Sequence, residues 1–296
     1  MTAEGFEKAR AEVGVIDTMI GFPAPREEQA KQYDFIRKQT HDADSQEWEF
    51  PAQYMFKGVP HYEQVDHPVE MLLAKMDEHG IRKAITGLPT QGDNPKRALE
   101  LYPDRFFACA PVDPNAGMDS VRALDEAVRV HGAKAAHCWG TGLIPQVAVN
   151  DKKMYPLYAK CVELDIPIFV YAGVPGPRIQ FAPQDVALLD EVCWFFPELK
   201  IITRHGAEPW TELMVKLLLK WPNLYYSTSA FAPKHYNERI IEFANTRGAE
   251  KVIYAGYYPM GLDIDRIFAE LPDVPFRDHV WPKFLYENAA RVLKLS

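Results

Sequence analysis

The chain has little of what marks several common classes of protein. It has 4 cysteines in 296 residues, and none forms a CxxC pair, so neither a zinc site nor a disulfide framework is indicated. No GxGxxG motif follows the first apolar run, which argues against a dinucleotide-binding fold. No apolar run reaches the roughly 18 residues of a membrane span. The first residues also lack the apolar core of a signal peptide.

Positive charge is scarce as well. Lysine and arginine number 33 against 41 aspartates and glutamates, for a formal net charge of -8. This balance argues against nucleic acid or an anionic membrane as the main partner. Without a disulfide pattern, a reducing cytoplasm is the simplest location. We therefore expect a cytoplasmic protein whose partner is a small molecule.

What the chain does contain is a regular alternation of apolar runs and amphipathic segments. The apolar runs are typical of buried parallel strands; they are 13–17, 81–88, 105–112, 132–138, 166–173, 199–205, 223–228 and 251–256. Between them lie helical stripes with 3.6-residue periodicity, such as Val69, Leu72, Leu73 and Met76. Eight alternations predict an α/β fold, a (β/α)8 TIM barrel that forms a single domain over residues 1–296.

One segment breaks this rhythm. Residues 22–66 follow the first strand and are polar and rich in aromatic side chains. In barrels of this kind, the loops after the strands build the active site. We interpret 22–66 as a lid-like insertion after strand 1 or as an oligomer contact. The alternative is a surface loop that only packs on the outside of the barrel.

Five short motifs occur in a fixed order on this rhythm: VIDT at 15–18, MDEHGI at 76–81, LKIITRHG at 199–206, PW at 209–210 and YENAARVL at 286–293. With them the whole chain resembles the amidohydrolase-2 family, the branch that contains aminocarboxymuconate-semialdehyde decarboxylase and related aromatic-acid decarboxylases and hydratases. The resemblance implies a barrel enzyme that catalyses a lyase or hydrolase step. By the same analogy we expect a homo-oligomer.

The family pattern implies metal ligands that this chain mostly lacks. It places an HxH or ExH pair after strand 1, histidines after strands 5 and 6, and an aspartate after strand 8. Here these positions hold Met19, Gly21, Tyr171, His205 and Tyr257. Because methionine, glycine and phenol are poor ligands for zinc or manganese, we expect no metal and no other cofactor. The remaining route to a transition metal is a site rebuilt from Asp17, His137, His205 and Glu208.

Four residues are candidates for catalysis. His205 ends a strand, so it should face the mouth of the barrel and act as general acid or base. Tyr171 and Tyr257 could donate hydrogen bonds to a developing oxyanion, or could simply fill the volume of an absent metal. Asp17 could orient His205, transfer a proton, or hydrogen-bond the turn that follows it.

Three residues are candidates for binding the substrate. Arg178 lies in a rigid loop after strand 5, where a guanidinium could grip a carboxylate. His137 and Trp139 share one side of strand 4 and would suit a planar substrate, although His137 could equally be a core histidine. Arg204 directly precedes His205, so alternation along the strand places it against the helices in a structural role.

These patterns lead to one favoured hypothesis and two alternatives. The favoured hypothesis is a metal-independent enzyme of this family that decarboxylates, hydrates or cleaves a C–C bond in a small cyclic or aromatic organic acid. The first alternative is a metal-dependent hydrolase with a rearranged site. The second is a catalytically inactive barrel that acts as a binding or scaffold subunit, since loss of ligands is what such a protein would also show.

Overall fold

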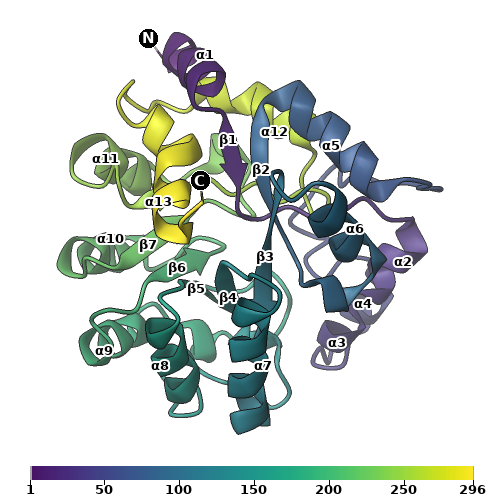
Figure 1. Ribbon diagram of the computed structural model, residues 1–296, viewed down its shortest axis with the longest axis vertical. Helices are drawn as coiled ribbons and strands as arrows, with labels where there is room; N and C mark the ends of the chain where they lie inside the picture. Colours follow the sequence, from purple (N-terminus) through teal and green to yellow (C-terminus); the bar gives the residue numbers. More distant parts are fainter. Residues whose placement is uncertain (1, 296) are drawn as a thin grey trace.

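The computed structural model describes residues 2–295, which form a barrel of parallel strands surrounded by helices (Figure 1). The strands follow one another in chain order around the sheet, and every neighbouring pair is parallel. They are β1 (Val15–Asp17), β2 (Ile81–Thr86), β3 (Phe106–Pro111), β4 (Ala135–Cys138), β5 (Ile168–Tyr171), β6 (Ile201–Arg204), β7 (Leu224–Ser227) and β8 (Val252–Ile253). The predicted TIM barrel is confirmed, and each strand lies inside its predicted apolar run.

The two edge strands, β1 and β8, meet through contacts just beyond their ends. Ile20 and Tyr258 form an isolated parallel bridge, in which the backbone nitrogen of Gly21 donates to the carbonyl of Tyr258 at 2.7 Å. Deeper in the barrel, the Thr18 hydroxyl donates to the carbonyl of Tyr254 at 2.9 Å. β8 is short. These contacts beyond its end join β1 to β8 at the carboxyl side of the strands.

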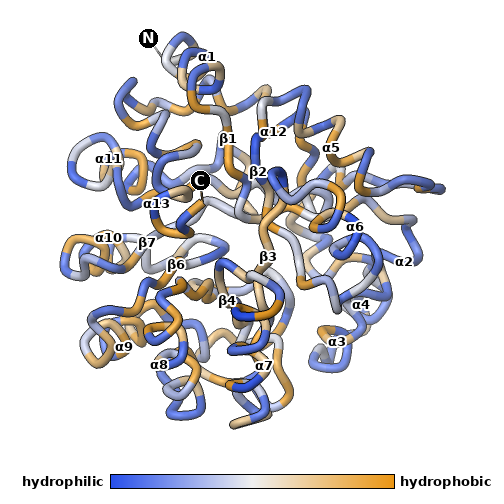
Figure 2. The backbone as a smooth tube through the Cα atoms, in the orientation of Figure 1, coloured by the Kyte–Doolittle hydropathy of each residue, from blue (hydrophilic) through white to orange (hydrophobic). Residues whose placement is uncertain are grey.

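The helices surround the strands (Figure 1), and hydrophobic and hydrophilic residues alternate along them (Figure 2). In α5 the predicted stripe Val69, Leu72, Leu73 and Met76 is buried, and the helix stops at Gly80, whose φ of 71° ends it in the left-handed region. The helices are α1 (Thr2–Glu12), α2 (Arg26–Lys31), α3 (Asp34–Arg37), α4 (Ala43–Glu47), α5 (Pro68–His79), α6 (Asp93–Leu101), α7 (Met118–Arg129), α8 (Tyr155–Glu163), α9 (Leu188–Phe195), α10 (Thr211–Lys220), α11 (Glu238–Thr246), α12 (Ile264–Glu270) and α13 (Asn288–Leu293).

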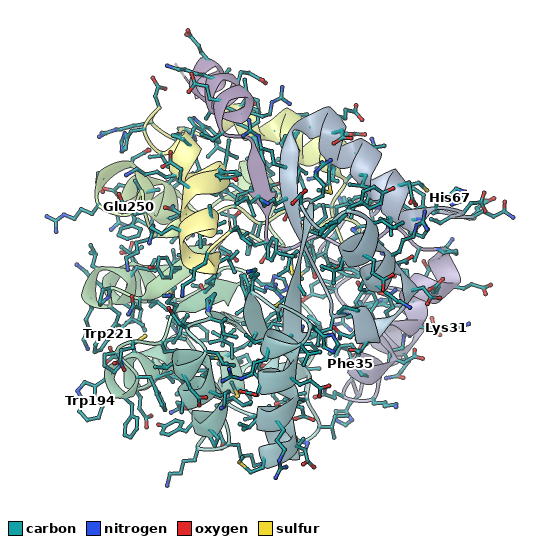
Figure 3. All side chains as sticks on the ribbon, in the orientation of Figure 1. Lys31, Phe35, His67, Trp194, Trp221 and Glu250 are labelled. Carbon is teal, nitrogen blue, oxygen red and sulfur yellow. The ribbon has the colours of Figure 1, made fainter. Side chains whose placement is uncertain are left out.

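The segment 22–66 contributes only the short helices α2, α3 and α4. Figure 3 shows Lys31 and Phe35 of this segment on one side of the molecule, across the barrel from Trp194 of α9. Its side chains contact loops that leave the carboxyl ends of β5 and β8, through Asp42 with Arg178 and Phe56 with Tyr257. Among residues 2–295, no helix is long and apolar enough to cross a membrane.

Candidate active site

The backbone turns sharply where β6 ends, and this turn brings two consecutive side chains to the barrel mouth. Arg204 is the last residue of β6 and the register partner of Tyr171 on β5, so both side chains share the inward face. His205 and Gly206 then have φ of 63° and 79°, in the left-handed region that strands do not use. Alternation therefore ends at Arg204, and our placement of this arginine against the helices is wrong.

His205 is held in this unusual conformation by one hydroxyl. A non-glycine residue with positive φ stores roughly 1–3 kcal/mol of strain and needs support from its surroundings. The Oγ atom of Ser229 accepts a hydrogen bond from the backbone nitrogen of His205 at 3.1 Å and lies 3.0 Å from its Nδ1. Ser229 is fully buried. Both the backbone and the ring of His205 are thus fixed by the same atom.

The imidazole of His205 lies between the two tyrosines expected at the mouth. Its ring centroid is 4.7 Å from that of Tyr171 and 5.0 Å from that of Tyr257, both in edge-to-face geometry. Burial, with the nearby charge of Arg204, lowers the pKa of His205 to about 3, so the imidazole is neutral near pH 7. Burial also raises the pKa of Tyr257 well above its usual range, so this phenol keeps its proton.

Aromatic side chains of the segment 22–66 cover this group. Phe50 and Phe56 contact Tyr257, with ring centroids 6.4 and 5.7 Å away. On the other side Trp139 stacks on Tyr171 at 5.3 Å, and Phe35 meets Trp139 edge-on at 5.8 Å. Residues from after β1, β4, β5, β6 and β8 therefore converge at one mouth, which is closed by aromatic rings.

Asp17 lies at the end of β1, 1% exposed, and its bonds go to the backbone. Its Oδ1 accepts from the nitrogens of Met19 and Gly256, both at 2.9 Å. Burial raises the pKa of this carboxyl to about 7, against these bonds and the charge of Arg204, which lower it. Its bonds are thus with the turn after β1 and the chain after β8, and none of them is with His205.

His137 lies in β4, and Trp139 directly follows this strand and packs on Tyr171 at the mouth. His137 is the register partner of Phe169, and burial lowers its pKa to about 3, with Arg204 contributing. Its Nδ1 and the Nε1 of Trp139 are both buried without a hydrogen-bond partner among the described residues. Buried polar atoms are normally paired, so these two atoms are open to a bound molecule or to water.

Arg178 lies away from this group. Its guanidinium forms ion pairs with Asp42 and Asp44 of the segment 22–66 and lies over the rings of Trp48, at 4.6 Å, and Tyr54, at 5.6 Å. Its side chain is 42% exposed. In the described structure Arg178 therefore ties the segment 22–66 to the loop after β5.

A cavity of about 550 Å³ is lined in part by Arg178. Its walls come from the segment 22–66 (Lys38, His41), the loop after β4 (Ile144, Gln146) and the loop after β5 (Arg178). A smaller cavity beside β4 and β5 is lined in part by Tyr171 and Gln184. Neither of these two cavities is lined by His205, which packs against the rings of Tyr171 and Tyr257.

The mouth does not offer a set of donors that fits a transition metal. Asp17 accepts backbone hydrogen bonds, the Nδ1 of His205 is engaged by Ser229, and Glu208 accepts from Asn237 at 3.2 Å. Among the described residues, ligand atoms of three His, Cys, Asp or Glu side chains gather within 4.8 Å of one another only at Glu78, His79 and Asp265. Three or four such donors are what a stable site requires.

The group formed by Glu78, His79 and Asp265 lies away from the mouth of the barrel. His79 ends α5 just before β2 begins, toward the amino ends of the strands, and Asp265 lies in the first turn of α12. The Nε2 of His79 is 2.7 Å from Asp265, whose other oxygen accepts from Lys75 at 2.5 Å. The ring of His79 stacks on Phe268 at 4.6 Å. The group could hold a cation in competition with Lys75.

The chain belongs to the amidohydrolase family, whose sequence profile matches residues 16–295. This confirms the resemblance seen in the five motifs, and with it an enzyme of the amidohydrolase superfamily. No curated protein sequence is significantly similar to the chain.

Solved structures with the same fold include three informative ones. A TIM-barrel protein from Bordetella bronchiseptica is 21% identical with a TM-score of 0.70, covering 95% of this chain and 98% of that one. A 5-carboxyvanillate decarboxylase from Novosphingobium aromaticivorans, with bound manganese and a nitrobenzoic acid, is 20% identical with a TM-score of 0.62, covering 96% and 99%. A 2,6-dihydroxybenzoate decarboxylase from Rhizobium is 17% identical with a TM-score of 0.62, covering 95% and 98%.

The expectation that the protein has no cofactor is contradicted. The similar decarboxylase from Novosphingobium carries bound manganese, and this chain has its own group of three potential ligands at Glu78, His79 and Asp265. The expectation counted donors only at the strand ends. It missed a group that combines residues of α5 and α12, whose positions are 186 residues apart at His79 and Asp265.

Sequence reasoning also missed Ser229 and misplaced Arg204. Nothing in the pattern around Ser229 links it to His205, which precedes it by 24 positions. For Arg204 one signal was present: a charged residue in an otherwise apolar strand must find a partner inside the protein. The turn that keeps both Arg204 and His205 at the mouth depends on φ angles, which the sequence hints at only through Gly206.

Proposed function

We propose that this protein catalyses a lyase or hydrolase step on a small cyclic or aromatic organic acid, at a carbon adjacent to a carbonyl group. Decarboxylation, hydration and C–C cleavage are the reactions in this class. The observation that carries the proposal is the imidazole of His205 between the phenols of Tyr171 and Tyr257 at the carboxyl ends of the strands. The amidohydrolase family and its aromatic-acid decarboxylases of similar fold support it.

The protonation states suit this chemistry. A neutral imidazole is in the form that accepts a proton, so we assign proton transfer to His205. The protonated phenol of Tyr257 donates a hydrogen bond to an enolate or oxyanion as it forms, and the hydroxyl of Tyr171 lies on the other side of His205 to donate a second one. Asp17, with a pKa of about 7, would exchange a proton with the site near neutral pH. His137 and Trp139 would hold the ring of the substrate through stacking and their unpartnered nitrogens.

The test is a turnover assay on a panel of aromatic and cyclic acids that includes 2,6-dihydroxybenzoate and 5-carboxyvanillate. Each acid is assayed with added manganese and after exhaustive chelation, and products are followed by carbon-13 NMR. The matched variant is His205→Asn, because asparagine tolerates positive φ and the backbone is preserved. We expect the variant to lose at least about 100-fold in kcat/KM, the range of general acid–base catalysis. Undiminished turnover in it would remove His205 from the mechanism.

One observation favours a second candidate, a catalytically inactive barrel that binds a partner. Tyr257 packs against His205, and Phe50 and Phe56 pack on Tyr257, as they would if the tyrosines only filled volume. This candidate predicts no turnover of any acid in the panel and a stable complex with another protein. Purification without a partner, together with thermal stabilisation by small acids, would count against it.

We also propose that the protein is a homo-oligomer that uses the segment 22–66 as a contact. Three large apolar side chains of this segment are exposed: Phe35 by 42%, Tyr54 by 57% and Met55 by 56%. Such side chains favour burial against another surface. Light scattering should give a particle mass of more than one chain. Replacing these three residues by serine should lower the particle mass towards that of a single chain. A monomeric wild type would contradict the proposal.

A further inference from the structure

Arg204 places a guanidinium with unused hydrogen-bonding capacity inside the barrel. Arg204 is 4% exposed, and its Nη2 donates to the carbonyl of Thr18 at 3.1 Å. Its Nε is buried and has no hydrogen-bond partner among residues 2–295. The group lies 4.3 Å from the centre of the Phe169 ring and 6.0 Å from that of Tyr171. A buried donor without a partner costs free energy unless something in the site accepts its proton.

Among residues 2–295, no carboxylate forms an ion pair or a hydrogen bond with Arg204, whose one side-chain hydrogen bond goes to the carbonyl of Thr18. The groups whose titration it affects are Asp17, Cys109, His137, His205 and Tyr257. Asp17 is the carboxyl group among them, and its Oδ1 accepts hydrogen bonds from two backbone nitrogens rather than from Arg204. A buried cation of this kind normally binds an anion.

Arg204 also lies beside residues at the positions where the family resemblance places metal ligands. The carbonyl to which it donates belongs to Thr18, directly before Met19, the first of the ligand positions. Its register partner, Tyr171, occupies another, and His205 follows it in the chain. The side chain of Arg204 therefore supplies a positive charge next to these ligand positions.

We propose that Arg204 binds the carboxylate of the substrate inside the barrel, with Thr18 holding one edge of the guanidinium and Nε facing the anion. The inference rests on the proposed function, because it names the group that recognises the acid. A planar guanidinium matches a carboxylate, and the rings of Phe169, Tyr171 and Trp139 suit an aromatic body beside it. The substrate class is therefore an aromatic carboxylate that enters when the rings over the mouth move aside.

The experiment compares two probes that differ by one group: 2,6-dihydroxybenzoate and resorcinol, which has the same ring and hydroxyls without the carboxylate. Dissociation constants are measured by calorimetry for the wild type, Arg204→Lys and Arg204→Met. We expect the wild type to prefer the carboxylate at least tenfold. Arg204→Met should bind both probes equally, and Arg204→Lys should keep part of the preference because it keeps the charge but not the planar donors.

A spectroscopic readout removes dependence on folding of the methionine variant. In protein labelled with nitrogen-15 at arginine Nε, the resonance of Arg204 is assigned by its absence in Arg204→Lys. It should move on addition of 2,6-dihydroxybenzoate and stay in place with resorcinol. An unmoved resonance at saturating 2,6-dihydroxybenzoate overturns the inference.

Arg178→Met separates this arginine from the other candidate. Arg178 was expected to grip the carboxylate, but it is paired with Asp42 and Asp44. We expect Arg178→Met to retain the tenfold preference. A preference lost in Arg178→Met and kept in Arg204→Met overturns the inference in favour of Arg178.

Failure of the inference and failure of the proposed function look different. Carboxylate binding through Arg204 without turnover of any acid leaves the inference standing and removes the function. Turnover with an unchanged KM in Arg204→Met removes the inference and leaves the function.

Discussion

The hydroxyl of Ser229 lies 3.1 Å from the backbone nitrogen and 3.0 Å from the Nδ1 of His205, so one buried side chain fixes both the strained backbone and the ring. Ser227, on the same side of the barrel, offers a matched comparison: its Oγ donates to the carbonyl of Thr203 at 2.8 Å and is equally buried. The two serines differ in whether they touch His205.

We predict that Ser229→Ala impairs the site more than Ser227→Ala does. Each variant should lose about 1 kcal/mol or more of unfolding free energy, because each leaves a buried partner without its hydrogen bond. Only Ser229→Ala should shift the imidazole carbon-13 and nitrogen-15 resonances of His205. Equal shifts in the two variants would show that Ser229 has no special relation to His205.

We predict that Asp17→Asn becomes more stable relative to the wild type as pH rises. The pKa of Asp17 is raised by burial from 3.8 to about 7, so between these values the folded state keeps a proton that the unfolded state releases. The wild type therefore loses about 1.4 kcal/mol per pH unit from this group in that window. Asparagine cannot ionise, and its amide oxygen still accepts from the nitrogens of Met19 and Gly256.

The measurement is the difference in unfolding free energy between Asp17→Asn and the wild type from pH 4 to 7. Taking the difference cancels the contributions of His137 and His205 to the unfolding free energy. Their pKa values of about 3 make both proteins lose stability as pH falls below 6.5, the ordinary pKa of histidine. A difference that is flat with pH would mean that Asp17 is ionised throughout.

We predict that Arg178→Met loosens the segment 22–66. The variant removes the pairs with Asp42 and Asp44 and the contacts with Trp48 and Tyr54. Because the pairs are partly exposed, global stability should change by no more than about 1 kcal/mol. Hydrogen exchange should nevertheless speed up in 38–56.

The matched control is Arg129→Met, which removes another partly exposed arginine that pairs with Asp125 on α7. It should leave exchange in 38–56 unchanged. The same exchange rates in both variants would mean that Arg178 does not hold the segment.

We predict that manganese added to the protein broadens the NMR resonances of His79 and leaves those of His205 sharp. Three donors gather at Glu78, His79 and Asp265, whereas no such group of three forms at the mouth among the described residues. Asp265→Asn should weaken the broadening at His79. Broadening centred on His205 would instead place the ion at the mouth.

Much of this architecture followed from local pattern. Eight apolar runs predicted eight strands, and the stripe from Val69 to Met76 predicted α5, because burial imposes a period of two or 3.6 on any sequence that makes these elements. The convergence of Tyr171, His205 and Tyr257 followed as well, since the carboxyl ends of parallel strands meet at one mouth.

Contacts between residues far apart in the chain were decided by the tertiary structure alone, because no local pattern encodes them. The left-handed φ of His205 turned Arg204 and His205 toward the same mouth, against the alternation that the strand predicts. Arg178 found its partner Asp42 at a separation of 136 residues, and His79 met Asp265 at 186. Periodicity reports which face of an element is buried. It does not report which distant side chain a buried or charged group will meet, because that depends on how the whole chain closes around the barrel.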